Sequence, residues 1–177
     1  MRFLLKCAAV SCAVCLVSVS QPANADAVHK PDPGVITVDY RCGDDMMWAF
    51  DWDTGTLTFS GSGEMWDFTE KNVPWKNMTY SVHQIAFDGA IESIGDYAFQ
   101  DCIMLKSVAI PTQITRIGDR AFRRCAQLEE ISLPDGLTEI GDAAFLDDRL
   151  ETVSLPETVR SIGASAFEDN KYLTAVC

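Results

Sequence analysis

The chain has 177 residues, of which 14 are basic and 26 are acidic, giving a net charge of −12 at pH 7. Such an acidic surface repels nucleic acid and anionic lipid, so the composition disfavours a phosphate-binding function and predicts no nucleic-acid partner. Only two histidines are present, which leaves few groups for acid–base catalysis. We therefore expect neither an enzyme nor a cofactor.

The N-terminus has the pattern of a secretory signal peptide. Arg2 and Lys6 precede an apolar run over residues 7–19, and a small-residue A-x-A cleavage pattern ends at Ala25. The run is shorter than the ~20 apolar residues that a membrane-spanning helix needs, so we expect no membrane insertion. We predict that residues 1–25 are removed and that the mature protein is secreted or held at the cell surface.

Cysteine spacing gives no indication of a metal site. Seven cysteines are present, and those outside the predicted signal peptide are Cys42, Cys102, Cys125 and Cys177. No pair of them has metal-ligand spacing, and only His29 and His83 could supplement them. The sequence therefore predicts no bound metal.

The second half of the chain repeats itself. The hexapeptide Ile-Gly-x-x-Ala-Phe recurs at steps of 23, 23 and 22 residues, beginning at Ile94, Ile117, Ile140 and Ile162. Columns of leucine and proline keep the same period, at Leu105, Leu128, Leu150 and Leu173 and at Pro111, Pro134 and Pro156. Several independent columns with one period of about 20–29 residues indicate a leucine-rich-repeat solenoid.

One unit can be interpreted residue by residue. Residues 128–133 alternate apolar and polar side chains at their end, as a short strand with one buried face does. Pro134 ends the strand because proline cannot donate to a sheet. Gly141 permits a tight bend, and residues 143–145 then form a turn of 3₁₀ or α helix. We expect one short parallel strand and one short helical turn per coil. The strands would pass through Ile85, Val108, Ile131, Val153 and Val176, and the buried rings of Phe99, Phe122, Phe145 and Phe167 would stack.

A column of small side chains lies three residues after each phenylalanine, at Cys102, Cys125, Asp148 and Asn170. Such side chains can hydrogen-bond buried turn backbone from coil to coil, and we favour this structural role. A disulfide between Cys102 and Cys125, which would stack one coil apart, is the alternative.

These units, Leu-x-x-Val/Ile-x-Ile/Leu-Pro followed by Ile-Gly-Asp-x-Ala-Phe-x-x-Cys, resemble the BspA-like leucine-rich repeats of bacterial surface proteins over residues 85–177. The resemblance implies a curved right-handed solenoid and an adhesin-like protein that binds matrix proteins or other cells. Two features depart from the pattern, because Ala164-Ser165 replaces Asp-x and the unit after Phe145 is one residue short.

The segment before the repeats is rich in β pattern. Residues 26–34 are polar and contain prolines, which predicts a flexible linker. Within residues 35–82, residues 47–60 alternate around an Asp-Thr-Gly turn and predict a β-hairpin, and a short helix is expected over residues 74–80. This segment resembles the cap that precedes such repeats, where it would cover the apolar end of the array, residues 83–177. We expect about four units, the last of them incomplete.

The Asp53-Thr54-Gly55 sequence is the strongest sign of an enzyme. Aspartic peptidases hold a catalytic carboxylate in such a loop, but they need two carboxylates that share a proton, and the chain has no second copy. A calcium site at Asp51-x-Asp53-x-Gly55 is the next alternative, although it lacks the later acidic ligands of an EF-hand. We favour an ordinary hairpin turn.

Two classes of function remain, a binding module and a structural spacer in a larger secreted protein. The partner of a binding module would be a protein or glycan on a cell surface or matrix. The outward strand positions that would form its concave face are Gln84, Ser107, Ala109, Glu130, Ser132, Thr152 and Ser154. These side chains are small and mostly polar, without aromatic anchors, which argues against a tight concave site but is compatible with weak, multivalent adhesion.

The C-terminal end of the sequence leaves the last strand short. When Val176 is aligned with Val153, the strand stops before the position that Leu155 fills in the preceding unit. Three interpretations stay open: a fragment of a longer array, self-association through this C-terminal edge, or fraying of the last half-coil.

Overall fold

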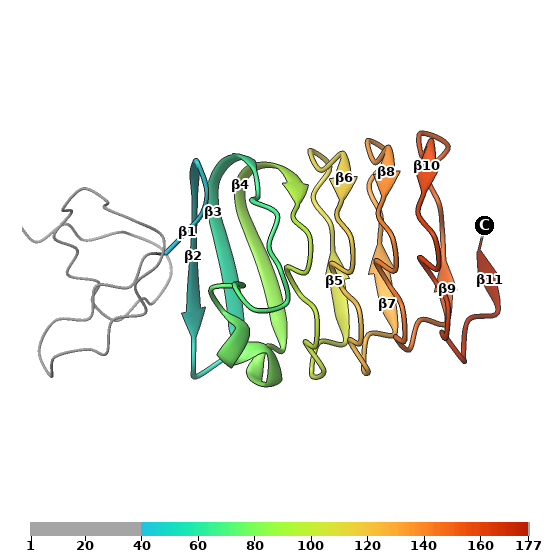
Figure 1. Ribbon diagram of the computed structural model, residues 1–177, viewed down its shortest axis with the longest axis horizontal. Helices are drawn as coiled ribbons and strands as arrows, with labels where there is room; N and C mark the ends of the chain where they lie inside the picture. The colour runs from blue at the N-terminus through green and yellow to red at the C-terminus, as the bar shows by residue number, and fades with distance from the viewer. Residues whose placement is uncertain (1–39, 177) are drawn as a thin grey trace, which may run out of the picture. The chain divides into compact units, whose positions relative to one another are not determined.

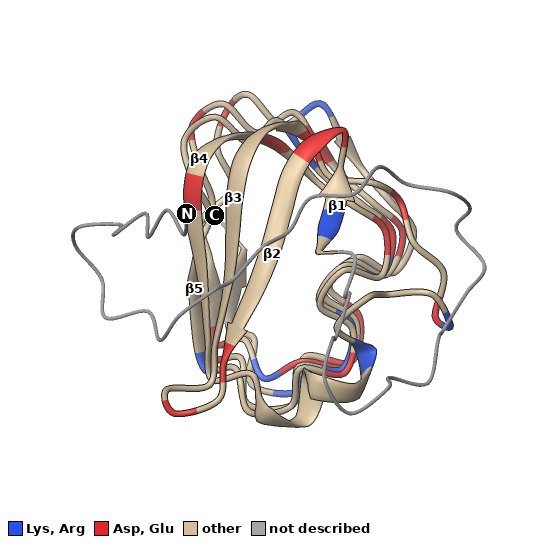
Figure 2. Ribbon diagram, turned by 90° about the vertical axis from the view of Figure 1, so that its left-hand side faces the viewer, with Lys and Arg blue, Asp and Glu red and all other residues tan. Residues whose placement is uncertain are grey.

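The computed structural model describes residues 40–176, so the predicted signal peptide (residues 1–25) and linker (residues 26–34) lie outside the described residues. The described residues all lie in one compact unit. Its coils are stacked along one axis, beginning with a β-rich N-terminal segment (Figure 1). Seen from the N-terminal side, the coils lie behind one another and outline the same closed loop (Figure 2).

The N-terminal segment consists of β1 (Arg41–Gly43), β2 (Asp45–Asp51), β3 (Thr56–Glu64) and the 3₁₀ helix η1 (Lys76–Ser81). β2 and β3 are antiparallel, which confirms the predicted hairpin, and η1 confirms the short helix. Along β2 the side chains alternate as the sequence predicts: Met46 and Trp48 are buried, whereas Met47 and Ala49 face solvent.

Strand β4 (Gln84–Ile94) joins this segment to the repeats. It runs parallel to β3 along most of its length and pairs at its end with the first repeat strand, through Ile94 opposite Ile117. One period before Pro111 the chain has Asp88 in place of proline. Because no proline ends it there, the strand continues through both halves of its coil.

Each later coil contributes two short strands, so the prediction of one strand per coil was wrong. The first set is β5 (Ser107–Ala109), β7 (Glu130–Ser132), β9 (Thr152–Val153) and β11 (Ala175–Val176). The second set is β6 (Arg116–Ile117), β8 (Glu139–Ile140) and β10 (Ser161–Ile162). The second strand has no visible alternation in the sequence because it is only two residues long, although Ile117 of β6 and Ile140 of β8 are buried in the core.

The continuous sheet follows the second set, in the order β1-β2-β3-β4-β6-β8-β10. The strand positions predicted to form one series lie in separate sheets. Val108 pairs with Ile131 in one two-stranded sheet, and Val153 pairs with Val176 in another. Ile85 pairs with Leu57 of the hairpin. The predicted register is therefore correct within each pair, and the predicted single sheet is not.

The turn between the Ile-Gly pair and the next leucine is not the expected helix. Residues at two positions of each turn have positive φ, such as Tyr97 at 59° and Asp101 at 67°. A left-handed residue every fourth position interrupts the i→i−4 pattern of a helix. Backbone N–H groups instead alternate: Ala98 donates within its own turn to Gly95, whereas Phe99 donates to Ala121 of the next coil at 2.7 Å. Straight chains of hydrogen bonds thus connect successive turns.

The phenylalanine column is the centre of the core, as predicted. The ring centroids of Phe99, Phe122, Phe145 and Phe167 follow one another at 5.1, 5.3 and 5.3 Å. The first three rings are fully buried, and Phe167, in the last described coil, is half-buried.

Trp75 continues this column into the N-terminal segment. Its indole is fully buried against Phe59 and Phe68, with ring centroids at 4.9 and 5.3 Å, and lies 6.3 Å from Phe99. Its Nε1–H donates to the Ala98 carbonyl at 2.6 Å. The segment therefore covers the first coil with both an apolar surface and a hydrogen-bond donor, which is the function of a cap.

We predict that Trp75→Ala destabilises the protein by ~3–5 kcal/mol, as for other buried aromatic truncations, because it opens a cavity and leaves the Ala98 carbonyl unpaired. Urea unfolding followed by circular dichroism measures the change. Trp52→Ala is the matched control, because the Trp52 side chain is 68% exposed and should cost much less. Equal losses in the two variants would contradict the capping role of Trp75.

Candidate functional site

The predicted binding face is formed by outward side chains on or directly after strands of the first set and by Gln84 at the start of β4. Every predicted member is exposed, namely Gln84, Ser107, Ala109, Glu130, Ser132, Thr152 and Ser154. Ser107 lies opposite Glu130, and Ala109 opposite Ser132, on the paired strands β5 and β7. Thr152 pairs with Ala175. Gln84 lies apart from this pairing, on β4, opposite Thr56.

None of the polar side chains on this face takes part in holding the fold together. Within residues 40–176, no hydrogen bond or ion pair involves the side chain of any of these seven residues, among them Glu130 and Ser132. Polar side chains in the turns, in contrast, form hydrogen bonds with the backbone of neighbouring coils. The polar side chains of the face are therefore available to a ligand, and each coil contributes one strand to the face.

The hairpin extends this face in a way that the sequence did not reveal. Thr58 pairs with Ala86 of β4 and with Ala49 of β2, and the neighbouring pair joins Ser60 with Met47. Met47 is 48% exposed and adds an apolar contact that the repeats lack. The alternation of both strands was visible in the sequence, but their placement beside β4 requires the parallel β3–β4 pairing, for which no local pattern exists.

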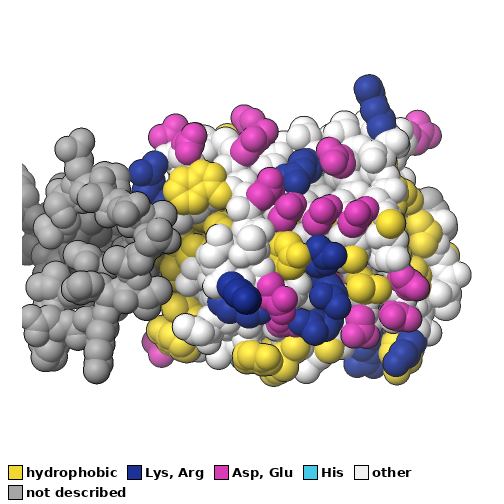
Figure 3. All heavy atoms as spheres, in the orientation of Figure 1, with side chains coloured by type: hydrophobic (Ala, Val, Ile, Leu, Met, Phe, Trp, Pro, Cys, Tyr) yellow, Lys and Arg dark blue, Asp and Glu magenta, His cyan; other side chains and the backbone are white. Residues whose placement is uncertain are grey.

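A row of aspartates follows the turns on another side of the molecule (Figure 3). In each, Oδ1 accepts the backbone N–H of the equivalent residue one coil later: Asp96 from Asp119 at 2.8 Å, Asp119 from Asp142 at 2.7 Å, and Asp142 from Ala164 at 2.7 Å. Asp67 of the cap starts the row by accepting from Asp96 at 3.1 Å. These carboxylates bind backbone, so the Asp of each Ile-Gly-Asp motif is structural.

Glycine precedes each aspartate because the coils approach closely at this point. A Cβ at Gly118 would collide with Oδ1 and the backbone nitrogen of Asp96. Glycine and aspartate of the Ile-Gly-Asp motif therefore act together, because the missing side chain of glycine leaves space for the aspartate carboxylate of the preceding coil. The repeated motif was seen in the sequence, but its role requires knowing which groups face one another across coils.

Arg116 joins the cap to the first coil through two of these carboxylates, with Nη1 3.0 Å from Asp67 Oδ1 and Nη2 2.9 Å from Asp96 Oδ1. Burial opposes ionisation of Asp67, but hydrogen bonds from Arg116 and from the Asp96 backbone hold its pKa below the usual value. Burial raises the pKa of Asp96, and the neighbouring Asp67 carboxylate adds to the increase. The three side chains therefore form an ion-pair cluster that links the cap to the first coil.

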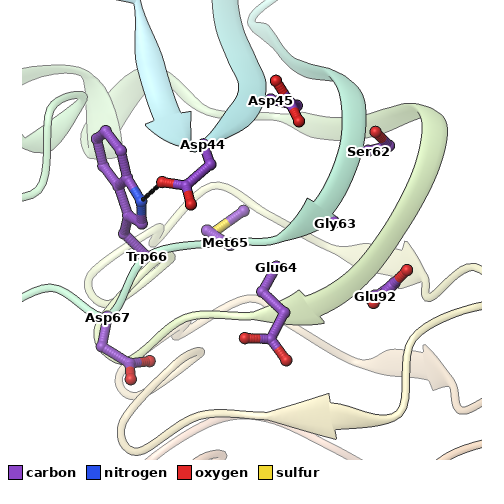
Figure 4. A pocket seen from close by; sticks show the side chains of 9 residues that line it. All are labelled: Asp44, Asp45, Ser62, Gly63, Glu64, Met65, Trp66, Asp67 and Glu92. Atoms are coloured by element: carbon purple, nitrogen blue, oxygen red, sulfur yellow. Dashed lines mark hydrogen bonds between the residues drawn. The ribbon is translucent and has the colours of Figure 1, made fainter.

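A shallow hollow of about 600 Å³ lies beside the cap (Figure 4). Its acidic lining residues are Asp44, Asp45, Glu64, Asp67 and Glu92. Trp66, which is 41% exposed, donates from Nε1 to Asp44 Oδ1 at 3.1 Å, and the Arg41 guanidinium lies 5.8 Å from the Trp66 ring centroid. Several carboxylates around one indole attract cationic groups. No sequence pattern reveals this hollow, because its lining residues come from three separate strands and loops.

The Asp53-Thr54-Gly55 segment forms the exposed hairpin turn. Asp51 Oδ1 accepts the backbone N–H groups of Asp53 at 2.9 Å and Thr54 at 3.4 Å, and the bond from Asp53 holds the pKa of Asp51 below its usual value. Asp51 therefore closes the turn, which accounts for the Asp-Thr-Gly sequence as an ordinary hairpin turn. Within residues 40–176, no group of three or more His, Cys, Asp or Glu side chains is placed to hold a metal ion.

The described cysteines Cys42, Cys102 and Cys125 are buried free thiols. Burial raises the pKa of Cys42 to about 12 and pushes the pKa values of Cys102 and Cys125 well above their usual range. Thiols with raised pKa values are poor nucleophiles. Cys125 has a structural role, because its Sγ donates to the Phe99 carbonyl at 3.3 Å.

Two-strand coils stacked on a phenylalanine column define a leucine-rich-repeat protein, and comparison with known sequences agrees. Residues 76–176 match the BspA type leucine rich repeat region in six copies, so the chain belongs to this family. A search of curated proteins found no match.

Solved structures show the same fold. A leucine-rich repeat protein from Eubacterium ventriosum is 25% identical with a TM-score of 0.65, over 78% of this chain and 39% of that protein. The leucine rich repeat protein of T. pallidum is 22% identical with a TM-score of 0.56, over 75% of this chain and 68% of that protein. This chain thus matches well under half of the E. ventriosum protein. Within residues 40–176, no helix is long and apolar enough to cross a membrane.

We predict that Asp53→Asn leaves the stability within about 0.5 kcal/mol of wild type, because the Asp53 carboxylate is exposed and caps nothing. Asp51→Ala should lower the urea midpoint, because the turn loses the acceptor for two N–H groups. The Asp51 contribution is present above pH ~4 and is lost as the pH falls through its lowered pKa. A pepstatin-sensitive cleavage that disappears in Asp53→Asn would overturn the turn interpretation.

Proposed function

We propose that this protein is a secreted or cell-surface binding module that contacts a protein or glycan through the outer strand face. The observation that carries the proposal is that the polar side chains of this face, from Ser107 to Ser154, are exposed and make no bonds within the described chain. The signal-peptide pattern of residues 1–25 supports export. This chain matches less than half of the E. ventriosum protein. Any activity that depends on the rest of such a longer protein is therefore also only proposed for this chain.

Each coil would contribute a weak contact through this face, and several such contacts together would give a higher overall affinity. Adjacent strands lie ~4.8 Å apart, so Ser107 and Glu130, or Ala109 and Ser132, can contact a ligand at regular intervals. A repetitive ligand such as an extended polypeptide or a glycan chain matches that spacing. No aromatic residue occupies the outward positions of β5, β7, β9 or β11, so affinity must come from several coils or several copies.

We also propose that the function involves no catalysis. The carboxylates of the turn row bind backbone, the described thiols are buried, and the Asp-Thr-Gly segment is a hairpin turn. The structural spacer is the competing proposal, and it predicts that the outer strand face binds nothing.

Binding of multivalent protein to a panel of extracellular-matrix proteins and a glycan array tests the proposal. The chain from residue 26 would be displayed on a tetrameric carrier, so that weak contacts add. We expect at least one ligand whose binding falls ~10-fold or more in Ser132→Arg, because the new side chain blocks the face. Gln113→Arg is the control, since Gln113 is exposed in a turn beyond this face. Equal binding by both variants, or no binding to any ligand, would favour the spacer.

We propose a second copy of the chain as a further partner, at the C-terminal edge. Within the described residues, β10 and β11 each pair on one side only, and Ile162 and Val176 are each 47% exposed. Open strand edges with apolar side chains pair with other chains. We expect concentration-dependent dimers in light scattering, weakened by Ile162→Lys and unchanged by Glu157→Lys, which alters an exposed turn. A monomer at all concentrations would contradict this proposal.

A further inference from the structure

One column of buried side chains differs in chemistry from coil to coil. It consists of the residues three positions after each core phenylalanine, Cys102, Cys125, Asp148 and Asn170. Two of them make the same contact, donating to the phenylalanine carbonyl of the preceding coil. Cys125 Sγ lies 3.3 Å from Phe99 O, and Asn170 Nδ2 lies 2.6 Å from Phe145 O. In these two coils the column thus places a donor against the phenylalanine carbonyl of the preceding coil.

Asp148 occupies the donor position of the third coil. Its Oδ1 accepts the Cys125 backbone N–H at 2.7 Å, but its Oδ2 is buried and has no hydrogen-bond partner among the described residues. By the repeat, the group that faces this position is the carbonyl of Phe122. A carboxylate oxygen and a carbonyl oxygen are both acceptors, so they can bond only if a proton lies between them.

Among the described residues, no cation forms an ion pair with Asp148. Of the charged groups beside it in its own coil, Asp147 is negative and Arg149 is paired with Glu129 at 3.1 Å. Lys171 and Asp169 of the following coil line the same surface hollow as Asp148, but neither forms an ion pair with it.

The preceding coil offers no counter-charge either. Arg124 lies 2.7 Å from Asp101, and the Nε of Arg123 is buried without a partner in the described chain. Cys102 and Cys125 are neutral thiols. An unpaired carboxylate in such a place costs several kcal/mol, and protonation is the way to avoid that cost.

We propose that Asp148 is protonated in the folded array and donates from Oδ2 to the Phe122 carbonyl. This bond makes the contact between the coils of Phe122 and Phe145 more stable at acidic pH. The repeat geometry carries the assignment, because both neighbours in the column donate to the equivalent carbonyl. Burial raises the pKa of Asp148 well above its usual value, and the Asp147 carboxylate adds to the increase.

The direction of the pH dependence follows from this raised pKa. An unfolded aspartate ionises near pH ~3.9, whereas folded Asp148 keeps its proton to higher pH. Between the two pKa values the native state binds one more proton than the unfolded state, so each pH unit increases the unfolding constant about tenfold through this one group. The stabilisation is complete below pH ~4 and is lost as the pH rises to the folded pKa.

Asp148→Asn isolates this effect, because an asparagine amide donates to the carbonyl at every pH, as Asn170 does. We expect the ratio of the wild-type unfolding constant to that of Asp148→Asn to rise about tenfold per pH unit above pH ~4 and then level off. Asp135→Asn, which removes an exposed carboxylate, should show a constant ratio. A ratio for Asp148→Asn that does not change with pH would overturn the proposal.

A titration of the wild-type protein gives an independent reading if the variant does not fold. Carboxyl carbon NMR should show Asp148 titrating well above the usual aspartate range near pH ~4. An Asp148 resonance that titrates within that range would refute protonation in the native state. A stable complex with a ligand is not needed for either measurement, so failure of the proposed binding function would leave this result unaffected.

Discussion

The alternating hydrogen bonds of the turns determine the rest of this structure. Phe99, Phe122 and Phe145 each donate to the following coil at 2.7 to 2.8 Å, and the residues between them close their own turns. This alternation needs a left-handed residue such as Arg120 or Ala143 at fixed intervals, at a cost of ~1–3 kcal/mol each. The cost is tolerated because the same geometry places every core ring over the next one.

Because the turns have a fixed geometry, a repeat unit that is one residue short must replace the backbone hydrogen bond that it loses. Leu105, Leu128 and Leu173 each donate from their backbone N–H to the residue three positions earlier. The shortened unit removes that acceptor from Leu150, which bonds instead to the side-chain Oδ1 of Asn170 at 3.1 Å. Asn170 also donates to Phe145 O, so this position needs a side chain that both donates and accepts. An ionised aspartate, which only accepts, could not do both for this joint.

Much of the fold could be predicted from the sequence because the strongest signals are periodic. The phenylalanine column, the register of Val108 with Ile131 and the hairpin around Gly55 all follow from spacing or alternation. The second strand of each coil and the non-helical turns could not be predicted, because two-residue strands have no pattern and positive φ at Tyr97 or Arg120 has no residue signature. The right-handed sense of the coil stays a prediction. The exposed face was found as a set of positions, whereas the acidic hollow around Trp66 was not, because its residues converge only through the pairing of β3 with β4.

The hydrogen bonds between coils also give the stack a direction. Gly118, directly after β6, donates backwards to Ile94, whereas Tyr97 in the turn donates forwards to Asp119. Both faces of a coil therefore carry a fixed mixture of donors and acceptors, and the leading face of one coil complements only the trailing face of another. Duplication of a whole unit in the gene would preserve every such contact, whereas an inverted or half-length insertion would oppose donor to donor. Arrays of this kind can thus gain or lose coils in evolution without redesign of their interior, and the cap must match only the first coil.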